Sequence, residues 1–420
     1  MKIVKNFFLF FHLNLAFSSI SDTDKKIIIE KCYWKILEII EKNNIPISLE
    51  MTGYTLTEIQ RLDKKWINKF KSLSKKKLTS LIGSGYCQII GPLCPYEINN
   101  YNIKFGNEIY KKILGFKPKI FHINEQCFSK SMVDIISDNN FKSIIMEFEN
   151  PFEHNKQIKF KDKFFNHRVR GIKKNLNLIW NSSVNFQKFQ KYIYGKETLK
   201  NYLNDVRKFD GKINCIYGSD AEVFDFRPKR NFQDEKIKYL EWKKIEDLLN
   251  QLVNFHKFKL IEEIALKKNF KNKSLFDLST AAMPCPTKKQ DKYNLNRWAI
   301  SSHRNHILNT KCYNFYNLLK KNKNLDNKQS WKKLVYFFSS DFRTHLESQR
   351  EKKLNIELLN FEKKIKKKIN KFKRKNKNFN KNVIIKKNDN LIERKEDSII
   401  INYKNIKLSL NLLRFLSLNY

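Results

Sequence analysis

The hydrophobic pattern of the chain alternates between short apolar runs and longer amphipathic segments. Seven short runs predict strands: Phe7–Leu15, Ile45–Met51, Cys87–Ile90, Ile120–Ile123, Ser143–Met146, Leu178–Trp180 and Ile213–Tyr217. Four segments between them carry apolar residues at three- and four-residue spacing and predict helices: Asp22–Asn43, Tyr96–Leu114, Ser129–Asn139 and Phe186–Val206. Repeated βα units of this kind build a parallel sheet. We therefore expect an α/β fold, a closed or nearly closed (β/α) barrel with its chemistry at the C-terminal ends of the strands.

After Glu235 the pattern becomes mainly helical, over Trp242–His256, Cys312–Lys321 and Trp331–His345. A Lys-rich stretch without glycine follows and predicts a solvated helix and linker, and the last residues alternate as strands do. We expect four parts: a barrel domain over residues 1–270, a helical region over 271–349 that completes the site, a Lys-rich helix and linker over 350–390, and the start of a β segment, incomplete here, over 391–420.

The N-terminus resembles a signal peptide, because Lys2 and Lys5 precede the apolar run Phe7–Phe17. His12 and Asn14 interrupt this run, however, so we favour a first buried strand. No other run approaches the roughly 20 apolar residues of a membrane span, and we expect none. The seven cysteines are scattered and never two residues apart, which indicates buried thiols in a reducing compartment, and hence a cytoplasmic location, with no disulfide framework.

The formal net charge of +42 raises the question of a polyanionic partner. The cations lie along the whole chain and most are lysine, accompanied by abundant Asn, Ile and Phe, as the codons of an AT-rich genome favour. Charge reports on solubility and association more than on fold. We therefore expect no specific nucleic-acid partner, and the sequence leaves the oligomeric state open.

Two acidic residues, Glu125 and Asp220, each follow a predicted strand within three residues. Retaining hydrolysis of a glycosidic bond needs such a pair about 5–5.5 Å apart, one to attack the anomeric carbon and one to protonate the leaving oxygen. The alternative is that both are ordinary surface acids. Glu222 adds a second candidate acid: in extended backbone it would point the same way as Asp220, and the like charges would make one of them keep its proton to higher pH.

These residues lie in segments that resemble the motifs of glycoside hydrolase family 57, in order and spacing over roughly residues 7–345. The segments are Phe11-His-Leu-Asn14, Leu81-Ile-Gly-Ser-Gly-Tyr86 with Gly91-Pro92, Asn124-Glu-Gln126 and Ser219-Asp-Ala-Glu-Val-Phe224. The resemblance implies an incomplete seven-stranded (β/α) barrel followed by a helical region. It also implies a retaining enzyme of α-glucans and related polymers, such as an amylase, a 4-α-glucanotransferase or a branching enzyme.

By the same resemblance, Glu125 is the nucleophile, Asp220 is the acid/base, and His12 and Gly83–Tyr86 line the sugar site. The chain departs from the family where His12-Leu13-Asn14 replaces a motif that commonly reads His-Gln-Pro, and around His122, where a tryptophan is frequent. Both departures indicate a distinct branch or an altered choice of substrate. Further stretches that look typical of a branch are Ile179–Ser182, Phe224–Pro228, Cys285–Gln290, Asn296–Trp298 and Ser339–Arg343.

Several other side chains are candidates for binding sugar, because aromatic faces combine apolar area with a polar edge and guanidinium groups bind carboxylates. The predicted substrate-binding set is His12, Asn14, Tyr86, Trp180, Glu222 and Trp298. Core packing is the alternative for the aromatic residues, as it is for Tyr217, and ion pairing is the alternative for Arg227, Arg230 and Arg297. We expect no metal and no cofactor, because Asn14 stands where a zinc-dependent relative needs a carboxylate and an amide binds zinc poorly.

Three functions remain open from the sequence. The first is a retaining hydrolase or transglycosylase of an α-linked polysaccharide or oligosaccharide, with water or a second sugar as the acceptor. The second is a catalytically degenerate barrel that uses its basic surface to hold a polysaccharide or another polyanion. The third, metal-dependent deacetylation, requires activity that is lost on chelation.

Overall fold

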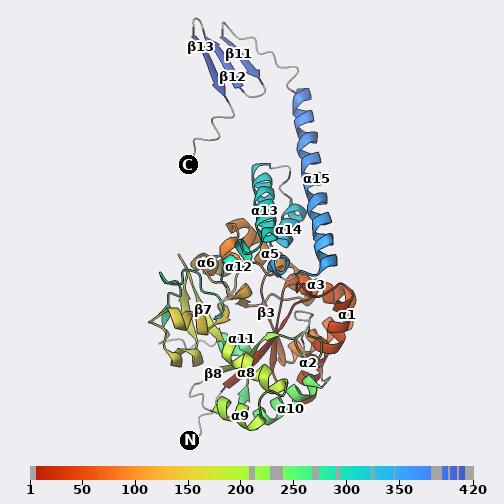
Figure 1. Ribbon diagram of the computed structural model, residues 1–420, viewed down its shortest axis with the longest axis vertical. Coiled ribbons are helices and arrows are strands. Elements are labelled where there is room, and N and C mark those ends of the chain that lie inside the picture. The colour runs from red at the N-terminus through yellow and green to blue at the C-terminus, as the bar shows by residue number, and fades with distance from the viewer. Residues whose placement is uncertain are drawn as a thin grey trace. The chain divides into compact units, whose positions relative to one another are not determined.

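Figure 1 shows a computed structural model of the chain. The structure describes residues 6–207, 213–227, 240–266, 274–289, 294–322, 325, 327–344, 346–379, 390–395, 398–403 and 406–411, without the side chains of His303 and of residues beyond 370. It divides into two compact units, Met1–Phe361 and Glu362–Tyr420. The proposed division into four parts stays a prediction.

The first unit is built on a curled, mostly parallel sheet. Its strands pair in the order β10-β6-β7-β5-β4-β3-β2-β1-β8, with β9 beside β1. In the described part of the chain, seven parallel strands form the barrel wall: β1 (Asn6–Leu13), β2 (Ile47–Met51), β3 (Thr79–Gly83), β4 (Ile120–His122), β5 (Ser143–Glu147), β7 (Asn175–Asn181) and β8 (Ile213–Asp220). Three short strands extend it: β6 (His167–Arg170), antiparallel to β7, β9 (Lys257–Phe258) and β10 (Leu275–Phe276). The expected incomplete (β/α) barrel is confirmed.

The wall is incomplete between β7 and β8, which do not follow one another in the order of paired strands. Instead, a side chain bridges them: Asn181 Nδ2 donates a hydrogen bond of 2.8 Å to the Gly218 carbonyl. A curled sheet that stops short of closure leaves room above its strand ends for a ligand.

Six of the seven predicted strands overlap observed ones, including the N-terminal run, which forms the buried strand β1. Cys87–Ile90 is wrong as a strand, because it lies in the loop after β3, where only Ile89 makes an isolated bridge, to Ser339. The third strand is Thr79–Gly83, which begins with two hydroxyl residues and so looks polar in sequence. Thr79 is nevertheless buried. Its hydroxyl group is satisfied there, because it donates a hydrogen bond of 2.7 Å to the Ile47 carbonyl.

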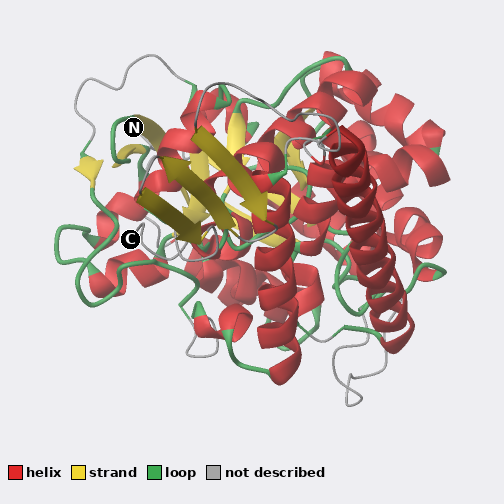
Figure 2. Ribbon diagram, turned by 90° about the horizontal axis from the view of Figure 1, so that it is seen from above, coloured by secondary structure: helices red, strands yellow, loops and turns green. Residues whose placement is uncertain are grey.

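Helices cover the outer side of this sheet (Figure 2). They are α1 (Asp24–Ile28), α2 (Trp34–Asn43), α3 (Gly53–Leu62), α4 (Lys64–Lys75), α5 (Tyr96–Leu114), α6 (Lys130–Asp138), α7 (Glu149–His154), α8 (Ser183–Ile193), α9 (Leu199–Arg207) and α10 (Glu241–Val253). All four predicted helices are present, but a π-helical turn over Ile29–Tyr33 divides the first, and the fourth is two helices, α8 and α9. The sequence reasoning missed α3 and α4.

Two apolar layers hold the barrel together. Between the sheet and the helices, strand residues such as Phe7, Phe11 and Leu49 pack against residues such as Ile36 of α2. The barrel interior holds a second cluster, formed by Phe8, Phe10, Ile82, Ile120, Ile145, Ile179 and Cys215, with Ile261, Ile264 and Ala265 of α11 (Ile261–Ala265). Inward-facing residues of β1, β3, β4, β5, β7 and β8 thus fill the interior, as in a packed barrel.

The chain after the barrel is helical, as predicted, over α12 (Asn296–Ala299), α13 (His303–Lys321), α14 (Lys328–Phe337) and α15 (Ser348–Phe379). The helix α14 packs against α5. Arg350, at the start of α15, donates to the carbonyls of Ala16 at 2.8 Å and Ile20 at 3.2 Å. These contacts hold the start of α15 next to the loop that follows β1.

The second unit contains an antiparallel sheet of β11 (Asn390–Lys395), β12 (Ser398–Tyr403) and β13 (Ile406–Asn411). The strand-like alternation near the end of the sequence is therefore confirmed. All seven cysteines are free thiols, and only Cys94 and Cys285 are partly exposed. Within the described residues, every helix is too short or too polar to cross a membrane.

Candidate active site

A layer of polar side chains lies directly above the apolar interior of the barrel, at the C-terminal ends of the strands. Along β1 the inward positions Phe8 and Phe10 are followed by His12, and on β4 Ile120 is followed by His122. In the same way Glu147 ends β5, Asn181 ends β7 and Asp220 ends β8. The sequence thus changes from apolar to polar at one level of the barrel.

This polar layer opens into a cavity of about 500 Å³. Among the described residues, four carboxyl groups, two imidazoles, two cationic side chains and several amides contribute to its wall. Its lining includes His12, Asn14, Gln88, His122, Glu125, Gln126, Glu147, Asn181, Ser219, Asp220, Lys288, Arg297 and Asp341. Glu125 and Asp220, more than 90 residues apart in the chain, therefore line one cavity.

A β-bulge turns Asp220 towards this cavity. In the ladder between β1 and β8, Phe8 pairs with Cys215 but Leu9 pairs with Tyr217, so that Ile216 is an extra residue. Cys215 faces the interior and Tyr217 the outer core. The extra residue shifts the alternation by one, and Asp220, which strict alternation from Cys215 would place on the outer face, lies on the inner one.

Glu125 lies in a short 3₁₀ turn after β4, where the backbone takes an unusual conformation. Glu125 has φ of 51° and Gln126 has φ of 59°, the left-handed region that side-chain-bearing residues rarely adopt. Such residues cost on the order of 1–3 kcal/mol each and persist where neighbouring contacts fix them. Here Asn124 Nδ2 donates to the Ser84 carbonyl at 3.0 Å, and Gln126 Oε1 accepts from the Glu147 amide at 2.8 Å.

The helical region supplies a hydrogen-bond donor and a further acid to this side of the cavity. Ser340 Oγ donates to Glu125 Oε1 at 3.2 Å. Asp341, which accepts from Asn14 Nδ2 at 3.1 Å, is buried. Burial and, to a smaller extent, the charge of Glu125 raise the pKa of Asp341 to about 7.

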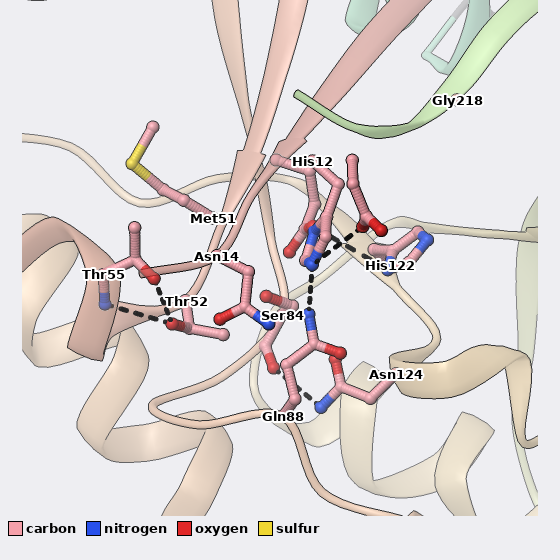
Figure 3. A network of polar contacts seen from close by, with 12 residues as sticks. His12, Asn14, Met51, Thr52, Thr55, Ser84, Gln88, His122, Asn124 and Gly218 are labelled. Carbon is pink, nitrogen blue, oxygen red and sulfur yellow. Dashed lines mark hydrogen bonds and ion pairs between the residues drawn. The ribbon is translucent and has the colours of Figure 1, made fainter. Parts of the chain in front are cut away.

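His12 and Asn14, both predicted to bind substrate, line the cavity. Figure 3 shows both residues within the surrounding network of polar contacts. The His12 ring is held on both nitrogens, with Nδ1 against Glu50 and Nε2 at 2.8 Å from Gln88 Nε2. His12 Nε2 also lies 3.9 Å from Asp220 Oδ1. Burial lowers the pKa of His12, so the ring is neutral at neutral pH.

Glu222 occupies a different place from the one expected. The strand ends at Asp220, and Glu222 lies in the following turn, 2% exposed, outside the cavity lining. Its carboxyl group accepts a hydrogen bond of 2.7 Å from the Asn14 backbone N–H and another from the Tyr33 hydroxyl. Burial, and then the nearby charge of Asp220, raise the pKa of Glu222 to about 7, so the expected like-charge interaction is present although the backbone is not extended.

The predicted aromatic sugar platforms do not line the cavity. Trp180 is 2% exposed and packs against Phe148, with ring centroids 5.4 Å apart. Trp298 is 0% exposed, in a cluster with Ile90 and Cys127. Tyr86 is partly buried beneath the ammonium group of Lys332, 4.6 Å from its ring centroid. Core packing, the alternative considered above, accounts for the two tryptophans.

Several cavity residues were not singled out from the sequence. Glu147 directly follows a predicted strand, the same signal that selected Glu125 and Asp220, and was overlooked. Burial and the adjacent Glu149 carboxylate raise its pKa. Gln88 lies inside Cys87–Ile90, which was predicted as a strand, and Lys288 and Asp341 lie in the stretches Cys285–Gln290 and Ser339–Arg343, which were noted without a role.

Arg227 and Arg297 lie in different surroundings. Arg227 forms an ion pair with Glu241, Arg297 lines the cavity, and Arg230 lies outside the described residues. In the described part of the chain, no three His, Cys, Asp or Glu side chains group as metal ligands do.

Comparisons with known proteins agree with this architecture. A curated relative from Methanocaldococcus jannaschii, named as a putative alpha-amylase, is 28% identical over 122 residues, which are 28% of this chain and 26% of that protein. The matched part thus spans about a quarter of that relative.

Two solved structures share the fold. A branching enzyme of glycoside hydrolase family 57 from Thermococcus kodakaraensis superposes with a TM-score of 0.64 at 10% identity, over 87% of this chain and 90% of that one. A 4-alpha-glucanotransferase from Thermococcus litoralis gives a TM-score of 0.56 at 13% identity, over 80% of this chain and 50% of that one. The sequence model of glycosyl hydrolase family 57 matches residues 1–279, more than half of the chain. We conclude that the chain belongs to glycosyl hydrolase family 57.

Proposed function

We propose that this protein is a retaining glycoside hydrolase or transglycosylase of α-linked glucans. The single observation that carries the proposal is that Glu125 and Asp220 line one polar cavity at the C-terminal ends of the barrel strands. Family membership supports an enzyme of glycosidic bonds. The α-glucan substrate is supported by the branching enzyme and the glucanotransferase that share the fold.

In the proposed first step, a Glu125 oxygen attacks the anomeric carbon, and Asp220 donates its proton to the departing glycosidic oxygen. A glycosyl ester on Glu125 and an ionised Asp220 result. In the second step Asp220 takes a proton from the acceptor hydroxyl, which attacks the anomeric carbon and releases Glu125. Two inversions give net retention.

The surroundings of Glu125 suit a nucleophile. The Ser340 hydroxyl donates to its carboxylate and fixes the direction of one oxygen. The left-handed backbone at Glu125 and Gln126 is fixed by the hydrogen bonds of the Asn124 and Gln126 side chains. Such preorganisation lowers the cost of reaching a near-attack geometry.

The polar character of the cavity favours a hydrophilic substrate. Glu147, Asn181 and Gln88 add hydrogen-bonding groups around the two acids. Lys288 and Arg297 place positive charge in the same wall. We propose that these groups bind sugar hydroxyls, and that His12 and Asn14 do so next to the acids.

The test is an activity screen of purified protein against soluble starch, maltooligosaccharides and other α-glucans. Glu125→Gln and Asp220→Asn should each lose on the order of 10³-fold in kcat or more. Glu38→Gln, which alters an exposed carboxylate on the outer helix α2, is the matched control and should retain wild-type rates. Wild-type rates in Glu125→Gln would show that the nucleophile is misassigned.

A second assay shows whether the glycosyl group passes to water or to a second sugar. An isotopically labelled maltooligosaccharide is added to unlabelled glucan, and the products are separated by size. Label in longer or branched products identifies a transglycosylase, whereas label confined to the added sugar and its fragments identifies a hydrolase. Salt-sensitive binding of polyanions, without any turnover of sugar, would support the degenerate binding protein instead.

A further inference from the structure

A fully buried carboxyl group lies beneath the cavity and is not part of its lining. Glu50, on β2, is the direct register partner of His12 on β1 and is 0% exposed. Its Oε2 contacts His12 Nδ1 and lies 4.0 Å from His122 Nδ1. Among the described residues, its Oε1 has no hydrogen-bond partner. A buried carboxylate with so few partners depends strongly on the N–H groups that remain.

The hydrogen bonds around His122 fix which of its nitrogens carries the proton. The Glu147 backbone N–H can only donate, so Gln126 Oε1, at 2.8 Å, is an acceptor. The amide nitrogen of Gln126 therefore donates to His122 Nε2 at 2.9 Å. Since Nε2 accepts, the proton of the neutral ring lies on Nδ1, on the side of Glu50.

His12 has partners of the same kinds, a glutamine at Nε2 and the Glu50 carboxyl group at Nδ1. Gln88 Nε2 lies 2.8 Å from His12 Nε2, and His12 Nδ1 contacts the Glu50 carboxyl. The two rings stack with centroids 6.0 Å apart, each between a glutamine and the side of Glu50. One buried carboxyl group thus faces the Nδ1 atoms of two imidazoles.

We propose that Glu50 is a positioning residue that keeps the proton of His12 on Nδ1 and so leaves Nε2, beside Asp220, as a hydrogen-bond acceptor. With the proton on Nε2 instead, His12 would donate towards the Asp220 carboxylate. That bond would favour the ionised form, which cannot protonate a leaving oxygen. The kinetic consequence rests on the proposed function, whereas the position of the proton does not.

Other charged and titratable groups also act on His12 and must be kept constant in the test. They come from every element around the ring: Asp220 on β8, Glu125 after β4, His122 on β4, and Lys288 from the loop before α12. None of these is changed by a substitution at position 50.

The experiment uses the full-length protein labelled with ¹⁵N in histidine, at a pH above 7. The imidazole nitrogen signals of His12 are identified by their loss in His12→Asn. We expect the wild-type His12 proton on Nδ1. In Glu50→Ala we expect the proton to move, at least partly, to Nε2 as the Gln88 amide turns its oxygen to the ring. Glu50→Gln, which keeps an acceptor oxygen and cannot ionise, should retain more of the Nδ1 form.

The kinetic arm compares kcat and KM of the same variants on the best α-glucan substrate. Glu50→Ala should lose at least about tenfold in kcat with little change in KM, because the acid step and not sugar binding is affected. The matched control is Ser48→Ala, on the same strand and in hydrogen-bond contact with Ser80 and the Ile261 amide, which should keep the His12 tautomer and kcat.

The proposal is overturned if the wild-type proton lies on Nε2, or if Glu50→Ala keeps both the Nδ1 proton and the wild-type kcat. If Glu50→Ala fails to fold, Glu50→Gln carries both measurements: it should lose part of the Nδ1 form and part of kcat, and wild-type values in both would overturn the proposal. If no variant and no wild-type protein turns over any glucan, the proposed function fails, while the tautomer measurement still decides the role of Glu50.

Discussion

His12 and Asp220 are direct neighbours across the ladder between β1 and β8, with His12 Nε2 3.9 Å from Asp220 Oδ1. On its other side, His12 is the register partner of Glu50. The three residues therefore form one row across three parallel strands. All three residues lie within paired strands, at the C-terminal end of the barrel. Backbone hydrogen bonds between the strands therefore fix their order, and flexible loops do not.

Gly218, two residues after the bulge at Ile216, is closely packed. A Cβ at this position would lie 2.4 Å from Asn181 Oδ1 and 2.5 Å from Phe10 Cε1. Gly218→Ala should therefore displace the Asn181 bridge between β7 and β8 and destabilise the fold by about 1–3 kcal/mol. Chemical denaturation measures this loss. An unchanged free energy of unfolding would show that the structure accommodates the added methyl group beside Asn181 and Phe10.

The hydrogen bond from Ser340 to Glu125 joins the helical region to the proposed nucleophile. Ser340→Ala removes a donor to a carboxylate, an interaction worth about 1.5–3 kcal/mol. We expect kcat/KM to fall by roughly tenfold to a hundredfold without loss of thermal stability. Steady-state kinetics of Ser340→Ala beside the exposed control Ser131→Ala test this, and equal rates would remove Ser340 from the site.

Glu222 makes stability depend on pH. Its pKa is raised from 4.5 to about 7 in the folded protein, so between these values the folded state binds a proton that the unfolded state has lost. This contribution is full below about pH 4.5 and is lost as the pH rises to about 7. Glu222→Gln lacks it, and from pH 4.5 to pH 8 its stability relative to wild type should rise by roughly 3 kcal/mol.

Unfolding curves of both proteins at several pH values check this prediction. The pH-dependent contributions of Asp341 and Glu147, whose pKa values are also raised, are common to both proteins and cancel in the difference. A difference that is constant with pH would mean that folding does not raise the pKa of Glu222.

Substitutions of Trp180 test whether this residue packs in the core or binds sugar. Trp180→Ala should cost about 3–5 kcal/mol of stability, because it opens a cavity beside Phe148 and Phe276. Trp180→Phe should recover most of that loss. A variant that keeps wild-type stability but raises KM for glucans would place Trp180 in the substrate site after all.

Much of the fold was predictable because strand and helix periodicities are local. The run Ile120–Ile123 and the helix Tyr96–Leu114 are examples in which pattern and structure coincide closely. The strand Thr79–Gly83 was missed because its buried hydroxyl groups are satisfied by partners on the neighbouring strand, which no local pattern reveals.

The candidate site, too, was predictable from the sequence only in part. Position after a strand selected Glu125 and Asp220, and the same signal was available for Glu147. The inward direction of Asp220 depends on a bulge at Ile216, which one extra residue in the ladder creates and which sequence alternation does not show. Glu50 was hidden for a different reason: it lies inside a predicted strand, and only the register with β1 brings it to His12.

The most direct test of the account is to trap the glycosyl ester. Asp220→Ala is incubated with an α-glucosyl fluoride, whose leaving group needs no proton, so that the first step proceeds while the second lacks its base. The account predicts a mass increase of one glycosyl unit, mapped by peptide mass spectrometry to Glu125 and absent from the double variant Glu125→Gln/Asp220→Ala. Attachment to another residue, or turnover with inverted configuration and no adduct, would contradict it.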